Sequence, residues 1–265
     1  MSPLRYLTTR DNARIAYRLD GPAEGPLLVL SNSIGTDLHM WDGQVAAFGE
    51  HFRVLRYDAR GHGASSVPSG RYPLARLAED VIELLDALGV QRAHFLGLSL
   101  GGFVGQWLAL NAPQRIERLV LANTSAWLGP QEQWDARIAE VLAAEDMQGT
   151  AQTFLANWFP VAWLQAQRPE VEPFRATLLA TNRHGLAGSF AAVQETDLRT
   201  ALRDVRLPTL VIAGQFDTVT AASHSELIAQ AIPGARLLTL PAVHLSNIEF
   251  PREFEGAVLD FLLAP

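Results

Sequence analysis

The 265-residue chain contains no cysteine, which excludes a disulfide framework, a zinc–thiolate centre and a cysteine nucleophile. Positive charge is also scarce, because 21 Lys and Arg stand against 28 Asp and Glu and give a formal net charge of −7. Without a basic cluster, nucleic acid is not expected as a partner. The hydrophobic fraction of 48% is ordinary for a globular protein, and the length suits one large α/β domain or two small ones.

Long apolar runs are missing as well. No stretch approaches the roughly 18 apolar residues that cross a bilayer, and the first 20 residues lack the apolar core of a signal peptide. We therefore expect a soluble cytoplasmic protein that acts on a small molecule without a membrane partner. No metal or cofactor is expected, because the chain has neither an H-E-x-x-H pattern nor a G-x-G-x-x-G loop after a strand. The sequence carries no signal for an oligomeric state.

Short apolar runs alternate with helical patterns along most of the chain. A hairpin is predicted at residues 4–8 and 13–19, and six further strands at residues 26–31, 53–58, 93–97, 118–123, 208–214 and 236–240. The clearest helix covers residues 74–88 and stops at Gly89. This alternation predicts a mostly parallel eight-stranded sheet flanked by helices.

One interval breaks the alternation. Residues 125–202 contain no convincing strand, and their helical patterns are separated by glycines and prolines. Four of the six tryptophans lie there: Trp127, Trp134, Trp158 and Trp163. We predict a helical cap at residues 125–202, inserted after the sixth strand, and a core formed by residues 1–124 and 203–265.

The segment from Gly97 to Gly101 reads G-x-S-x-G, with Ser99 at its centre. An apolar run precedes it and a helical pattern at residues 102–110 follows, which is the strand–turn–helix setting of a nucleophile elbow. A chance match in a glycine-rich turn is the alternative, and the flanking elements argue against it. Ser99 is therefore the predicted nucleophile.

A serine nucleophile needs a histidine base and an acid that orients it. After a nucleophile elbow the chain order is serine, acid, histidine, with the histidine beyond the last strand, and only His244 fits. Asp217 follows the predicted strand at residues 208–214 and is the predicted acid. The strand before that one ends at Asn123, where no carboxylate is present, and we expect Asn123 to be dispensable for catalysis.

An oxyanion hole needs two backbone N–H groups. One is expected from Leu100, which follows the nucleophile, and the other from Ile34, in the loop after the strand at residues 26–31. A second polar loop, residues 58–63, contains Asp58, Arg60 and His62. It is interpreted as a hydrogen-bonded structural loop, with a second catalytic group as the alternative.

The whole chain resembles an α/β-hydrolase of the single-domain, cap-bearing type. The motifs that carry the resemblance lie at residues 32–41, 58–63, 97–101, 214–217 and 243–249. The first block and the cap segment at residues 182–193 are similar to 3-oxoadipate enol-lactone hydrolases. This similarity implies a serine hydrolase that opens the enol-lactone to 3-oxoadipate in aromatic-compound catabolism, through an acyl-enzyme and without a cofactor.

Two alternatives stay open beside this activity. One is a general carboxylesterase or perhydrolase of the same fold, and the other is a ligand-sensing receptor built on a hydrolase scaffold. The enol-lactone carries a carboxylate, and burying an unpaired carboxylate is costly. The cap offers Arg137, Arg168, Arg175 and Arg183 as partners. Arg137 lies three residues after Trp134, so on a helix the two share a face and are the predicted substrate-binding pair, although a solvated Arg137 is the alternative.

Overall fold

The computed structural model describes residues 2–264 and contains one eight-stranded sheet in the order β1-β2-β4-β3-β5-β6-β7-β8. The strands are β1 (Arg5–Thr8), β2 (Arg14–Asp20), β3 (Leu27–Ser31), β4 (Arg53–Tyr57), β5 (Ala93–Leu98), β6 (Ile116–Ala122), β7 (Thr209–Gly214) and β8 (Arg236–Leu240). Strand β2 pairs antiparallel with β1 and β4, and the remaining neighbours pair in parallel. The fold-class prediction is confirmed.

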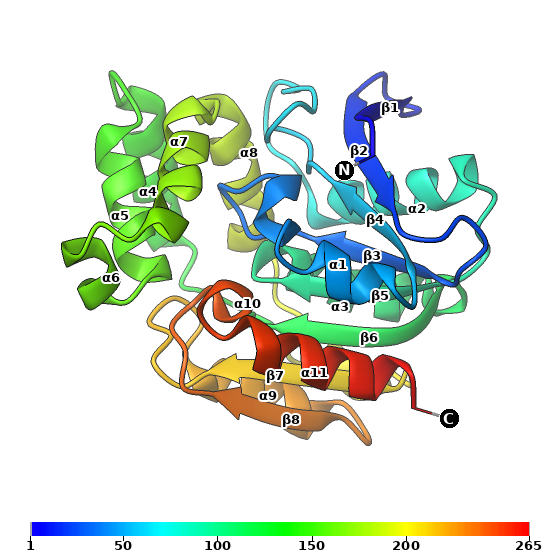
Figure 1. Ribbon diagram of the computed structural model, residues 1–265. Coiled ribbons are helices and arrows are strands. Elements are labelled where there is room, and N and C mark those ends of the chain that lie inside the picture. Colours follow the sequence, from blue (N-terminus) through cyan, green and yellow to red (C-terminus); the bar gives the residue numbers. More distant parts are fainter. Residues whose placement is uncertain (1, 265) are drawn as a thin grey trace.

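Helices cover both faces of the sheet (Figure 1). On one face, α2 (Leu74–Ala87), α3 (Leu100–Asn111) and α9 (Ala222–Ala231) contribute to the apolar core that contains Val29 and Phe95. On the other face, α1 (Val45–Gly49) and α11 (Pro251–Leu262) contribute to the core that contains Leu28 and Leu96. Neighbouring residues of one strand thus enter opposite cores, as the alternation of side chains along a strand requires.

Five α-helices follow β6 and lie together beyond the end of the sheet at which the parallel strands finish (Figure 1). They are α4 (Glu132–Ala143), α5 (Gln148–Trp158), α6 (Val161–Gln165), α7 (Glu172–Ala180) and α8 (Arg183–Gln194). Trp134 of α4 belongs to the first apolar core and Trp158 of α5 to the second. The Tyr72 N–H also donates to the Gly188 carbonyl at 3.0 Å, so the helices are joined to the sheet domain by packing and by a backbone hydrogen bond.

Short helices complete the described chain: 3₁₀ turns η1 (Leu38–Trp41), η2 (Pro113–Arg115), η3 (Pro169–Val171) and η4 (Ala201–Asp204), and α10 (Ser246–Glu249). The helix expected at residues 102–110 begins two residues earlier, at Leu100, directly after Ser99. Its first turn contains Gly101 and Gly102, which are poor helix formers, and the sequence pattern therefore understates its length. Within residues 2–264 no helix is long and apolar enough to cross a membrane.

Candidate active site

Ser99 lies in the turn between β5 and α3 with φ 57° and ψ −115°. A positive φ is uncommon for a residue with a side chain, and it is tolerated here because the surrounding structure fixes the turn. The Ser99 N–H donates to the Ala122 carbonyl at 3.0 Å, and the Thr124 hydroxyl donates to the Ser99 carbonyl at 2.7 Å. Ala122 is the last residue of β6 and Thr124 follows in the loop after it, so the turn is held by the neighbouring strand and its loop.

The glycines on either side of Ser99 are required by close backbone approach. A Cβ atom at Gly97 would lie 2.1 Å from the Gly101 carbonyl oxygen, and one at Gly101 would lie 2.2 Å from the Ser31 carbonyl oxygen. Neither distance is compatible with a side chain. The G-x-S-x-G pattern is therefore a packing requirement of this turn, which sets the serine at the carboxyl edge of the sheet.

His244 and Asp217 form a buried pair beside this turn, 1% and 4% exposed. His244 Nδ1 lies 2.8 Å from Asp217 Oδ2. An ionised carboxylate only accepts hydrogen bonds, so Nδ1 carries the hydrogen and Nε2 is left as the basic nitrogen. The structure thus brings the predicted base and acid into contact from the loops after β8 and β7.

The Asp217 carboxylate accepts further hydrogen bonds from within its own loop. The Val219 and Thr220 N–H groups donate to Oδ1 at 2.8 and 2.9 Å, and the Thr220 hydroxyl donates to Oδ2 at 2.8 Å. Burial alone would raise the pKa of Asp217, but the charge of His244 and these hydrogen bonds outweigh it and lower the pKa to about 2. Asp217 is therefore ionised throughout the neutral range.

Asn123 also supports Asp217, which the sequence analysis missed. Its Nδ2 donates to Asp217 Oδ2 at 3.1 Å, and its Oδ1 accepts a hydrogen bond from the Ser246 hydroxyl at 2.5 Å. The expectation that Asn123 is unimportant rested on its lack of a carboxylate and does not fit this contact. The only sequence signal was its position at the end of β6, next to β7 in the sheet.

The two predicted oxyanion donors lie close to Ser99. Leu100 is the first residue of α3, so its N–H has no acceptor one turn earlier in the helix. Ile34 lies in the loop after β3 and lines the same cavity as Ser99. The Gly101 N–H donates to the Asn32 carbonyl at 3.0 Å and so fixes this loop against the start of α3.

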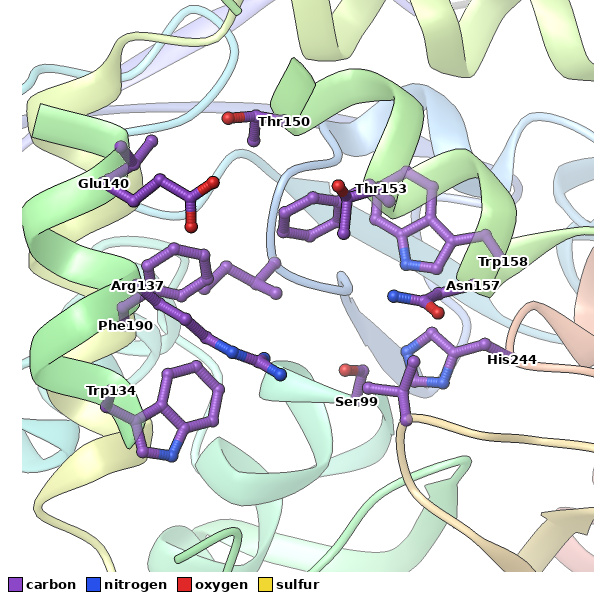
Figure 2. A pocket seen from close by; sticks show the side chains of 14 residues that line it. Ser99, Trp134, Arg137, Glu140, Thr150, Thr153, Asn157, Trp158, Phe190 and His244 are labelled. Atoms are coloured by element: carbon purple, nitrogen blue, oxygen red, sulfur yellow. The ribbon is translucent and has the colours of Figure 1, made fainter. Parts of the chain in front are cut away.

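A cavity of about 180 Å³ opens between these residues and the cap helices α4 and α5. Ser99 and His244 lie at the same end of it, and Val141, Phe154 and Phe190 supply apolar surface (Figure 2). Pockets for drug-sized ligands are commonly about 300–1,000 Å³, so this one suits a smaller molecule. No group of three or more His, Asp or Glu side chains in the described part of the chain is arranged to hold a metal ion.

Comparison with known proteins places this arrangement in a family. Residues 26–251 match the family model described as the alpha/beta hydrolase fold. The chain belongs to the α/β-hydrolase family.

Relatives of this α/β-hydrolase include 3-oxoadipate enol-lactonase 2 of Acinetobacter baylyi, 39% identical over 252 residues that cover 95% of this chain and 94% of the relative. A putative carbamate hydrolase, RutD, of Pseudomonas savastanoi is 34% identical over 251 residues, which cover 91% of this chain and 95% of that relative. These similarities support hydrolase activity for the protein.

Two solved structures are similar over almost the whole chain. A hydrolase from Pseudomonas aeruginosa PA01 is 74% identical with a TM-score of 0.98, and 98% of each chain is covered. The enol-lactonase of Burkholderia xenovorans LB400 is 40% identical with a TM-score of 0.94, and 98% of this chain and 100% of that chain are covered. The protein is thus similar to hydrolases of more than one named activity, including enol-lactonases.

In this α/β-hydrolase, Arg137 extends from α4 toward Ser99 (Figure 2). Its guanidinium carbon lies 5.0 Å from the centroid of the Trp134 ring, so the two side chains share a helix face as the spacing predicted. Trp134 is fixed in turn, because its Nε1 donates to the Leu128 carbonyl at 2.5 Å. No carboxylate in residues 2–264 forms an ion pair with Arg137, which leaves its charge available to a ligand.

The other three cap arginines do not line this cavity. Arg168 pairs with Glu170 at 2.8 Å, Arg175 pairs with Glu172 at 3.3 Å, and Arg183 donates to the Ala144 carbonyl. Sequence analysis also missed four polar residues of the cavity wall, which come from α4 and α5: Glu140, Thr150, Thr153 and Asn157. Their helical spacing is that of any exposed helix face, so nothing in the sequence distinguishes them.

In the loop at residues 58–63, the side chains of Asp58 and Arg60 form structural contacts. Asp58 accepts hydrogen bonds from the Leu38 and Ala64 N–H groups at 2.7 and 2.8 Å, and burial raises its pKa to about 6. Arg60 forms a buried ion pair with Asp80, Nε to Oδ2 at 2.7 Å. Neither residue lines the cavity, so the alternative of a second catalytic carboxylate finds no support here.

Proposed function

We propose that the protein is a serine hydrolase that opens 3-oxoadipate enol-lactone to 3-oxoadipate in the breakdown of aromatic compounds. The observation that carries the chemistry is the buried contact between His244 and Asp217 at one end of a cavity that Ser99 also lines. The enol-lactonase relatives, at 39 and 40% identity, support this substrate.

In the proposed mechanism, Ser99, His244 and Asp217 act as a catalytic triad. His244 Nε2 takes the proton of the Ser99 hydroxyl as its oxygen attacks the lactone carbonyl carbon. The Ile34 and Leu100 N–H groups stabilise the negative oxygen of the tetrahedral intermediate. When the intermediate collapses, the ring C–O bond breaks and the leaving enolate takes up a proton to become a ketone.

The second half of the reaction releases the product. His244 takes a proton from a water molecule, whose oxygen attacks the ester carbonyl of acylated Ser99. The Ser99–acyl bond then breaks, the serine regains its proton, and 3-oxoadipate leaves with a new carboxylate. The proton transfers to and from Ser99 pass through His244, and the new carboxylic acid releases its remaining proton to solvent. Asp217 stabilises the imidazolium that forms twice in the cycle. The mechanism needs no metal or cofactor.

In this proposal residues 125–202 form the cap that selects the substrate, over a core of residues 1–124 and 203–265. Arg137 binds the substrate carboxylate, with Trp134 as the apolar wall beside it. An unpaired carboxylate is costly to bury, and Arg137 is the cation of this cavity that has no ion pair within the described residues. The guanidinium lies on the Ser99 side of the cavity (Figure 2), which suits a short acid whose ester is attacked by Ser99.

Carbamate and simple ester hydrolysis are the competing assignments, because a carbamate hydrolase relative is 34% identical and the same triad attacks any acyl group. The test measures kcat/KM of the wild-type protein for the enol-lactone, p-nitrophenyl acetate and a small alkyl carbamate. A preference for the lactone of at least about a hundredfold is expected. A higher value for the carbamate or the ester would overturn the substrate assignment and leave the serine mechanism to be tested separately.

A further inference from the structure

The loop that carries Ile34 is held at two points, one on each side of that residue. On the N-terminal side the Asn32 carbonyl accepts a hydrogen bond from the Gly101 N–H at 3.0 Å. On the C-terminal side the Gly35 N–H donates to Nε2 of His62 at 2.9 Å. His62 comes from the loop after β4, 27 residues further along the chain. The position of the Ile34 N–H therefore depends on both attachments.

The two contacts of His62 select one form of its ring. The Gly35 N–H can only donate, so Nε2 must be the nitrogen without hydrogen. Nδ1 then carries the hydrogen and faces the Arg60 carbonyl oxygen at 3.3 Å. A protonated ring would set two N–H groups against each other at Nε2. Burial lowers the pKa of His62, against the opposing effects of the Arg60 carbonyl and the Asp37 charge, and so favours the neutral ring.

The Gly35 N–H belongs to the central peptide of a tight turn. Thr36 N–H donates to the Ser33 carbonyl at 3.3 Å, and Gly35 has φ +79°, as the third residue of a type II turn requires. Type I and type II turns differ by a rotation of this central peptide. By holding its N–H, His62 keeps this peptide in the type II orientation and so anchors the C-terminal side of Ile34. The Ile34 N–H itself belongs to the preceding peptide, on the side that the Asn32 carbonyl holds.

We propose that His62 is a positioning residue of the oxyanion hole, whose neutral ring holds the Gly35 N–H and thereby aims the Ile34 N–H at the reacting carbonyl. His62 does not line the cavity, so it acts only through this loop. The inference rests on the proposed serine mechanism but not on the identity of the substrate. Removing one oxyanion donor outright costs about 10²–10³ in kcat, and a misaligned donor should cost part of that.

The test compares His62→Gln with His62→Asn. A glutamine side chain reaches the position of Nε2 with an acceptor oxygen, whereas asparagine ends near Nδ1 and leaves the Gly35 N–H without an acceptor. With p-nitrophenyl acetate we expect kcat of His62→Asn to fall at least about tenfold with KM almost unchanged. His62→Gln should stay within about threefold of the wild type. The same two substitutions at exposed His51 serve as the control and should change neither constant.

A transition-state analogue separates positioning from general damage. A trifluoromethyl ketone adds to the serine hydroxyl and places a negative oxygen in the oxyanion hole, so its affinity should fall in His62→Asn by the same factor as kcat/KM. Equal kcat in His62→Asn and His62→Gln, or a loss confined to KM, would overturn the proposal. Ser99→Ala is measured in parallel, because activity surviving in that variant would refute the serine mechanism itself rather than the role of His62.

A measurement on the wild-type protein completes the test if either variant fails to fold. The ¹⁵N resonances of the His62 ring report which nitrogen carries the hydrogen at neutral pH. The proposal requires hydrogen on Nδ1 and none on Nε2. Hydrogen on Nε2, or on both nitrogens, would overturn it, because the Gly35 N–H would then have no acceptor.

Discussion

The cavity has one wall from the sheet domain and one from the cap, and the two differ in how firmly their side chains are held. Ser99, Asp217 and His244 are all less than 10% exposed, and Asp217 alone accepts five hydrogen bonds. Arg137 and Glu140, on the cap wall, are exposed, and neither forms an ion pair in the part of the chain that the structure describes. The sheet wall is organised before a substrate binds, whereas the charged side chains of the cap wall remain available to it.

This difference indicates a division of labour. Groups that must stabilise charge in a transition state work best when they are already fixed, because no energy is then spent on arranging them during the reaction. Groups that select a substrate need only a favourable contact in the bound state. Substitutions in the sheet wall should therefore lower kcat for every substrate, and substitutions in the cap wall should change KM for some substrates only.

The largest effect is expected at Ser99. Ser99→Ala should lower kcat by about 10⁶ for the lactone and for p-nitrophenyl acetate alike, because no other group can form the acyl-enzyme. Steady-state kinetics measure both rates. Thermal unfolding checks the stability of the variant, and its Tm should differ little from that of the wild type. Residual activity above a tenth of the wild type would show that another group carries the reaction.

Asp217→Asn should lower kcat by about 10⁴, again for both substrates. The Val219 and Thr220 N–H groups require the amide oxygen at the Oδ1 position, so the amide NH2 group faces His244 Nδ1. His244 then loses both its hydrogen on Nδ1 and its charge partner. Steady-state kinetics at neutral pH measure the loss. Asp86→Asn, an exposed change on α2, is the matched control. An almost unchanged kcat in Asp217→Asn would mean that a different carboxylate orients His244.

The sequence predicted most of the sheet wall because its chemistry depends on local patterns. Gly97, Ser99 and Gly101 form a motif whose spacing follows from backbone contacts, and His244 and Asp217 each follow an apolar run that reads as a strand. The contacts of Asn123 with Asp217 and of His62 with Gly35 join residues 94 and 27 positions apart. Such contacts depend on the order of strands in the sheet, which hydrophobic periodicity does not specify.

The cap wall was predicted less completely for a related reason. Trp134 and Arg137 lie one helical turn apart, so their shared face is visible in the sequence. Glu140 and Asn157 come from two helices that face each other across the cavity, and their side chains resemble those of any solvated helix. Which polar residues of a cap reach the cavity is decided by how its helices pack on the sheet domain.

Asn123→Ala should lower kcat by about tenfold, an effect between those of the triad and the cap. It removes one of the five hydrogen bonds to Asp217 and leaves the Ser246 hydroxyl without its acceptor, losses that are worth roughly 1–3 kcal/mol in a buried site. The lactone and the neutral ester should lose equally. Asn111→Ala, exposed at the end of α3, is the control. An unchanged kcat would show that Asp217 is held well enough without the amide.

Arg137→Ala should raise KM for the enol-lactone by about fivefold, the effect of roughly 1 kcal/mol expected for an exposed charge, and leave kcat nearly unchanged. The methyl ester of the same lactone has the same ring and no charge, so its KM should stay constant. Arg175→Ala is the control, since Arg175 is only partly buried and lies outside the cavity. Equal losses on both substrates would assign Arg137 to supporting the cap.

A separate prediction concerns stability in acid rather than catalysis. Folding lowers the pKa of Asp217 from its ordinary 3.8 to about 2, so the ionised carboxylate stabilises the fold above pH 4 and this contribution disappears as the pH falls toward 2. Between pH 5 and 2, the free energy of unfolding of the wild type should fall by about 2 kcal/mol more than that of Asp217→Asn. Urea unfolding at several pH values measures this, and parallel curves would contradict it.

The most direct test of the account is the wild-type specificity ratio between the enol-lactone and its methyl ester. The two substrates share the ring, the leaving group and every step at Ser99, and differ only in the charge that the cap is proposed to bind. We expect kcat/KM to favour the acid by about fivefold or more at low ionic strength, with similar kcat values, and the preference to shrink as salt is added. Equal or higher kcat/KM for the methyl ester would contradict the account.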